Sequence, residues 1–210
     1  MSSSIVSSIS SQAAALPQTQ KAARVTGLSA QSGERYSSTG IWIGVFAISM
    51  SFAAFTSALF VREGTTDWTH LVLPSVVYFN TFLLLASSGT LEMARRRLQE
   101  QDGSRKASAW VLLTLMLGLA FCVGQYRVWL DLRAAGIYLA SNPNSSFFYL
   151  LTFLHALHVC VGVAVLVYYA GHLLASHTAF RRGLFRNRAV YWHFMTVLWV
   201  YLLLLCVVKL

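Results

Sequence analysis

Five long apolar runs, separated by short polar segments, dominate the pattern of this chain. They cover residues 40–61, 70–91, 108–126, 147–174 and 189–208. An α-helix rises about 1.5 Å per residue, so about 20 apolar residues cross ~30 Å of hydrocarbon. A membrane-spanning β-strand needs only about 10 residues and alternates apolar with polar positions, which these runs do not. The pattern therefore predicts an all-α fold, a polytopic membrane bundle of five transmembrane helices.

Residues 1–39 have a different composition, which is rich in Ser, Ala and Gln. This segment has no apolar stretch of roughly 7–15 residues, so it lacks the central region of a secretory signal peptide. We predict a disordered cytoplasmic tail over residues 1–39, followed by a membrane domain over residues 40–210. An organellar transit peptide stays open as the alternative, because the segment is Ser-rich, weakly basic and poor in acids.

Charge supports the membrane assignment and predicts an orientation. Only 11% of the residues are charged, whereas soluble domains have about 25%. The formal net charge is +9, but the basic residues cluster between apolar runs without zinc-ligand spacing or an aromatic-interleaved groove, so we expect no nucleic-acid partner. Twelve of the 16 Lys and Arg residues fall on the side of the N-terminus, which predicts a cytoplasmic N-terminus and a C-terminus outside.

Ionisable residues inside a membrane are candidates for function, because they are costly to place there. Glu92 stands three and four residues before Arg95 and Arg96, which predicts a local ion pair at the end of the second run. His155 and His158 lie mid-run and three residues apart, hence on one helix face. Three interpretations of these histidines stay open: hydrogen bonding between helices, ligation of haem or a metal, and proton relay.

Five segments occur in an order that is recognisable. They read GIWIGVFAISMSFAAF, FNTFLLLASSGTLEMARRRL, WVLLTLMLGLAFCVGQYRVW, GIYLASNPNSSFFYLLTFLHALHVCVG and AVYWHFMTVLWVYLLLL, and they cover residues 40–205. HALHVCVG and YWHF are the most specific among them. In this order the segments resemble subunit III of the haem-copper cytochrome c and quinol oxidases, in the form that has five helices.

The resemblance implies a subunit of an oxidoreductase complex with no redox centre or catalytic residue of its own. Such a subunit packs on subunit I, supports proton uptake and turnover stability there, and holds phospholipid in a cleft between its helices. Haem and copper are expected in subunit I and not in this chain. Subunits I and II are the expected partners, a small subunit IV and a larger respiratory supercomplex are further candidates, and the bacterial inner membrane is the expected location.

The resemblance also implies a set of residues at helix-packing positions, the subunit interface or the lipid cleft. They are Trp42, Asn80, Ser87, Ser88, Gln125, His155, His158, Gly162, Trp192 and His193. Three family carboxylates are replaced, by Met50, Val128 and Thr196. Any proton handling through those three acids is therefore not expected of this chain.

Two other function classes stay open beside the oxidase subunit. An independent membrane haem protein would use His158 and His193 as axial ligands, and it predicts a haem spectrum for the isolated chain. A small transporter or channel homodimer predicts flux in liposomes without a partner. The scarcity of intramembrane charges argues against the transporter.

Overall fold

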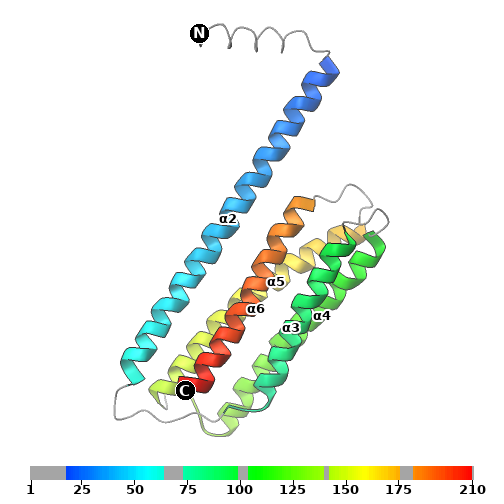
Figure 1. Ribbon diagram of the computed structural model, residues 1–210. Coiled ribbons are helices and arrows are strands. Elements are labelled where there is room, and N and C mark those ends of the chain that lie inside the picture. Colours follow the sequence, from blue (N-terminus) through cyan, green and yellow to red (C-terminus); the bar gives the residue numbers. More distant parts are fainter. Residues whose placement is uncertain (1–17, 64–72, 99–103, 140–141, 176–181, 210) are drawn as a thin grey trace, which may run out of the picture. The chain divides into compact units, whose positions relative to one another are not determined.

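The described part of the computed structural model consists mainly of helices (Figure 1). The structure describes residues 18–63, 73–98, 104–139, 142–175 and 182–209, and the side chains of most of them. The helices are α2 (Gln18–Glu63), α3 (Val76–Arg97), α4 (Ser104–Ala134), α5 (Pro143–Ala175) and α6 (Arg182–Lys209). The described residues contain no strand, so the all-α prediction is confirmed.

The chain divides into two units, Met1–Trp42 and Ile43–Leu210. Within the predicted tail, residues 18–39 are the beginning of helix α2, and the division into a cytoplasmic tail and a membrane domain stays a prediction. This stretch contains Ala, Gln, Lys and Arg residues, which have high intrinsic helix propensity. Residues 1–17 lie outside the described residues, so the prediction for that part of the tail is untested.

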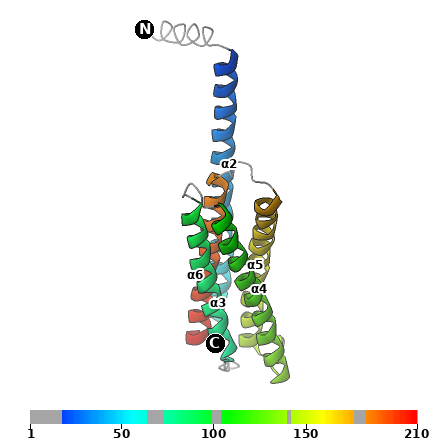
Figure 2. The ribbon, with the colours of Figure 1, turned by 90° about the vertical axis from the view of Figure 1, so that its right-hand side faces the viewer.

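In the second unit, α3, α4, α5 and α6 form a four-helix group. Helix α3 packs on α4 and α6, and α5 packs on the same two helices; Figure 2 gives a second view of these helices. The buried residues of α3 show why its sequence packs this way. They recur at alternating spacings of three and four residues: Val77, Asn80, Leu84, Ser87, Leu91 and Ala94. This spacing places one stripe of the helix toward its neighbours, as in helix bundles.

Four stretches of the described residues are long and apolar enough to cross a membrane. They are Thr39–Arg62, Ala107–Ala134, Pro143–Gly171 and Arg188–Lys209. The multi-pass membrane prediction is therefore confirmed. Helix α3 is not among the four, because its 22 residues include Glu92 and three consecutive arginines near its end as well as buried polar side chains. Residues 70–72 of the predicted second span lie outside the described residues, so the count of five spans stays a prediction.

The membrane stretch of α2 is the most exposed of the four. Only 17% of its most apolar window is buried, against 33–44% in the other three stretches. Its buried side chains are Phe52, Thr56 and Leu59, which share one face of the helix. Tyr201 of α6 donates a hydrogen bond to the hydroxyl of Thr56 over 3.1 Å. The membrane stretch of α2 therefore meets the neighbouring helices along one stripe, and its other described side chains are exposed or only partly buried.

Candidate functional site

Trp192 of α6 lies at the centre of the four-helix group. Its side chain is 2% exposed, and its indole N–H donates a hydrogen bond to the hydroxyl of Ser87 on α3 over 3.0 Å. Two glycines make room for the indole. A Cβ atom added at Gly118 of α4 would lie 2.9 Å from Cη2 of Trp192, and one added at Gly162 of α5 would lie 3.1 Å from Cε3. The structure thus brings together Ser87, Gly162 and Trp192 from the predicted set, in one closely packed contact of four helices.

The next residue of α6 links to the end of α3. His193 is half-buried, and its Nδ1 shares a hydrogen bond with the hydroxyl of Ser88. Its Nε2 lies 3.9 Å from a carboxylate oxygen of Glu92. Glu92 in turn accepts hydrogen bonds from Arg95 over 2.7 Å and from Arg96 over 3.1 Å. The ion pair predicted from the spacing of these residues is therefore confirmed.

The arginines keep Glu92 ionised. Hydrogen bonds from Arg95 are the largest influence, and together with those from Arg96 they outweigh partial desolvation and lower the pKa of Glu92 from 4.5 to about 2. The same contact raises the pKa of Arg95. At neutral pH this end of α3 therefore carries a charged network whose carboxylate faces His193.

A second polar layer lies deeper among the four helices. Asn80 of α3 donates from its amide nitrogen to the carbonyl of Phe121 on α4 over 3.4 Å. His155 of α5 is completely buried, with its ring centroid 6.0 Å from that of Phe121 and 5.0 Å from that of Trp199. Gln125, one turn along α4 from Phe121, is also buried. Three more residues of the predicted set thus lie inside the four-helix group.

The two mid-run histidines have different surroundings. His158 is only partly buried, and its Nδ1 lies 2.7 Å from the carbonyl of Leu154 in the preceding turn. Its ring centroid is 6.1 Å from that of Phe52 on α2, and its carbonyl accepts a hydrogen bond from the hydroxyl of Tyr191 over 2.9 Å. A separation of three residues on a helix turns a side chain by about 60°. That rotation is enough to place His155 in the interior and His158 beside α2.

The structure does not bring His158 and His193 together as a pair of axial haem ligands. Nδ1 of His158 lies against its own helix, and its ring contacts α2. Nδ1 of His193 is bonded to Ser88 on α3. A bis-histidine haem site needs two imidazoles that point at one iron from opposite sides. The two histidines have separate neighbours on different helices, so their geometry does not support that alternative.

Trp42 and the three positions without the family carboxylates lie in unlike environments. Trp42 is 61% exposed and does not join the buried residues of the predicted set. Met50 is 58% exposed on α2, whereas Val128 is completely buried on α4. Thr196 is buried on α6, and its hydroxyl donates to the carbonyl of Trp192 over 3.1 Å. The three replaced positions therefore do not form one shared polar site.

Two interhelical contacts lie outside the predicted site set. The indole N–H of Trp199 donates to the hydroxyl of Thr81 over 2.9 Å, and that of Trp129 donates to the hydroxyl of Thr152 over 3.2 Å. Together with Trp192, they make three tryptophans that each donate to a hydroxyl on a neighbouring helix. A sequence signal for them exists, since an indole within an apolar run needs an acceptor and hydroxyls recur in the facing runs.

Comparison with known proteins gives a consistent assignment. The family model described as cytochrome c oxidase subunit III matches residues 36–208, which include the membrane stretch of α2 and all of the four-helix group except Lys209. A protein named cytochrome c oxidase subunit 3 from Pelomedusa subrufa is 29% identical over 167 residues, which are 79% of this chain and 61% of that protein. Proteins of the same name from Synechocystis sp. and Thermostichus vulcanus are 27% and 26% identical, over 80% and 78% of this chain and 69% and 82% of their own lengths.

The chain thus spans about three-fifths of the Pelomedusa protein and more of the other two. The matched range contains every buried residue of the predicted set, and it runs through α3, α4, α5 and α6 without interruption. Because the family model covers most of the sequence, this chain belongs to the cytochrome c oxidase subunit III family.

Proposed function

We propose that this chain is a non-catalytic accessory subunit of a proton-pumping haem-copper terminal oxidase, which packs on subunit I, stabilises the complex and binds lipid. Membership of the subunit III family is the single observation that carries this proposal. The complex would reduce oxygen to water in subunit I, which would hold the haem and copper, and this chain would bind neither. Subunit II and a small subunit IV are the other proposed partners.

The outward face of α3 is the proposed contact with subunit I. It exposes a stripe of large side chains at helical spacing: Tyr78 (53%), Phe79 (62%), Phe82 (65%) and Leu85 (49%). Aromatic side chains are enriched in protein interfaces, so this stripe suits a protein neighbour.

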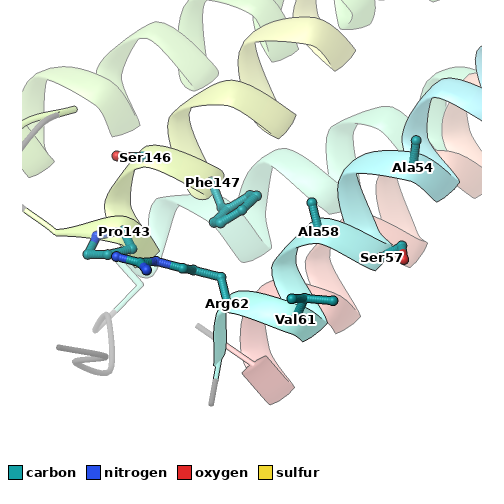
Figure 3. A pocket seen from close by; sticks show the side chains of 8 residues that line it. All are labelled: Ala54, Ser57, Ala58, Val61, Arg62, Pro143, Ser146 and Phe147. Carbon is teal, nitrogen blue, oxygen red and sulfur yellow. The ribbon is translucent and has the colours of Figure 1, made fainter. Parts of the chain in front are cut away.

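A pocket between α2 and α5 supports the lipid-binding part of the proposal (Figure 3). Its volume is about 750 Å³, and its lining is Ala54, Ser57, Ala58, Val61, Arg62, Pro143, Ser146 and Phe147. The short side chains of Ala54 and Ala58 leave space beside the ring of Phe147, while Arg62 extends toward Pro143. An apolar wall with a guanidinium at one end suits an acyl chain joined to a phosphate, because Arg binds phosphate oxygens through paired N–H donors.

The proposed location is the bacterial inner membrane, with the N-terminus in the cytoplasm. Support comes from the arginines at the ends of the helices. Helices α3 and α6 are antiparallel, so the end of α3 with Arg95–Arg97 and the start of α6 with Arg188 lie on the same side. The last turn of α4 carries one basic residue, Arg133. Segments rich in Lys and Arg stay on the cytoplasmic side. Labelling of single cysteines in the loops of intact cells would test this orientation.

The test of the function is a pull-down of the tagged chain from native membranes in mild detergent, with a reduced-minus-oxidised spectrum and identification of partners by mass. We expect a complex that contains a haem-copper subunit I. When this chain is removed from that complex, the separated chain should be colourless. A chain that purifies alone with a haem band would instead be a cytochrome. A colourless chain that purifies alone would belong to another system. Mass identification in the same experiment would show whether a larger respiratory assembly is present.

A matched pair of variants tests the proposed face. Phe82→Ala removes an exposed aromatic ring from the stripe on α3, and Leu157→Ala removes a side chain of similar exposure from α5. We expect less subunit I to co-purify with the first variant and an unchanged amount with the second. Equal losses in both variants would contradict the assignment of subunit I to α3.

A further inference from the structure

Several buried polar side-chain atoms at the centre of the four-helix group lack a hydrogen-bond partner among the described residues. Both ring nitrogens of His155, both amide atoms of Gln125 and Oδ1 of Asn80 are buried, and they have no hydrogen-bond partner within the part of the chain that the structure describes. The exposed fraction is 0% for His155, 1% for Gln125 and 0% for Asn80. Buried polar atoms are nearly always bonded to protein or to an ordered water molecule, because an unbonded one destabilises the fold.

The contact between α3 and α4 fixes the position of Asn80. Its amide nitrogen donates to the carbonyl of Phe121. Its Oδ1 lies directly over Gly124, where an added Cβ atom would come within 1.9 Å of it. The absence of a side chain at Gly124 therefore creates the space that Asn80 occupies. Gln125 is the next residue of the same turn of α4, so the two amides lie at one level of the bundle.

The contact between α4 and α5 brings His155 to the same level. The hydrogen bond from Trp129 to Thr152 fixes the register of these two antiparallel helices. One turn back along α4 from Trp129 is Gln125, and one turn forward along α5 from Thr152 is His155. Gln125 and His155 therefore lie at equal depth on neighbouring helices.

Aromatic rings enclose this level of the bundle. The rings of Phe121 and Trp199 lie edge-on to each other at 5.0 Å, and each contacts the ring of His155. The indole N–H of Trp199 is already donated to Thr81, so it does not serve the imidazole. The rings of Phe121 and Trp199 present faces and edges to His155, and these cannot replace a hydrogen bond to either ring nitrogen.

We propose that Asn80, Gln125 and His155 bind a small cluster of internal water molecules at the centre of the four-helix group. A neutral imidazole offers one donor and one acceptor, a glutamine amide offers both, and Oδ1 of Asn80 accepts. Water has two donors and two acceptor sites, so water molecules complement the hydrogen-bonding groups of all three side chains. One imidazole and two neutral amides make a poor set of metal ligands, since none of them brings a negative charge. The water would join α3, α4 and α5 in place of direct side-chain bonds.

A density map of the intact complex in native lipid, at a resolution that shows ordered water, tests this proposal. We expect a density peak within about 3.2 Å of a His155 ring nitrogen and of the Gln125 amide, as in ordinary hydrogen bonds. A direct bond between Gln125 and His155 with no peak beside them would overturn the proposal, and the wild-type map alone decides this. In a second map, His155→Phe should lose the peak and His158→Phe should keep it. A peak that persists in His155→Phe would equally overturn the assignment.

Discussion

Gly124 of α4 is a position where one added methyl group should weaken the bundle by an amount that the structure allows us to work out. In Gly124→Ala the new carbon would lie 1.9 Å from Oδ1 of Asn80, 2.8 Å from its Cγ and 3.0 Å from its Nδ2. Ordinary contacts between non-bonded carbons are about 3.5–4.0 Å. Asn80 must therefore rotate away, or α3 and α4 must separate.

Three contributions decide the size of the effect. Rotation of Asn80 breaks its hydrogen bond to Phe121 and costs about 1 kcal/mol. Overpacking of a close helix contact costs about 1–3 kcal/mol. Replacement of glycine by alanine within a helix returns about 1 kcal/mol. The expected result is a net loss of about 1–3 kcal/mol in the free energy of unfolding.

Thermal unfolding of the chain within the purified complex would measure this loss. Gly89→Ala on α3 is the matched control, because an added Cβ there meets no atom within 4 Å. It should be neutral or slightly stabilising. In an Asn80→Ala background the Gly124→Ala change should cost much less, since the side chain that it clashes with is gone. Equal stability of Gly124→Ala and Gly89→Ala, or simple additivity with Asn80→Ala, would refute the reasoning.

Three further predictions concern other parts of the bundle. Trp192→Phe removes the donor to Ser87 and part of the indole, so it should lower the melting temperature, with a loss of about 2 kcal/mol. The pKa of Glu92 is lowered on folding from 4.5 to about 2, so its stabilising effect is present above pH 4.5 and fades as the pH falls toward 2; Glu92→Gln should remove this part of the acid dependence of melting. Val128→Glu places a carboxylate in the dry interior and should abolish assembly, whereas Met50→Glu on the exposed face should reduce it less. Co-purification with subunit I measures the last pair, and equal effects would contradict the burial difference.

Much of the fold could be predicted from the sequence, because apolar length determines which segments can cross a membrane. The ion pair of Glu92 could also be predicted, since side chains three and four residues apart on a helix are neighbours whatever surrounds them. The helical continuation of α2 through residues 18–39 was not predicted. A composition rich in Ser and Gln is typical of disordered segments, although the Ala, Lys and Arg residues among them favour a helix.

The arrangement of the buried polar residues could not be predicted from the sequence. The spacing of His155 and His158 indicates one helix face, but it does not say which of them faces the interior. Likewise, the sequence shows that Gly118 and Gly162 are small residues. It does not predict that Trp192 packs against both, because this contact depends on how far each helix is displaced along its neighbour. That displacement is set by side-chain shapes from several helices at once, and no single run contains the information.

Two of the three positions at which the resemblance implies a carboxylate, Val128 and Thr196, lie in the interior and are neutral in this chain, whereas Met50 lies on the exposed surface of α2. Val128 is completely buried and apolar. The hydroxyl of Thr196 donates a hydrogen bond to a carbonyl of its own helix, so neither position carries a charge. A buried ion must be paired and hydrogen-bonded to be tolerated, whereas an apolar residue in its place needs no partner. The deep layer is left with Asn80, Gln125 and His155, which are polar but carry no obligatory charge. Such a layer can hold helices in register through hydrogen bonds and bound water, and the only carboxylate near it along α3, Glu92, is held by two arginines at the helix end.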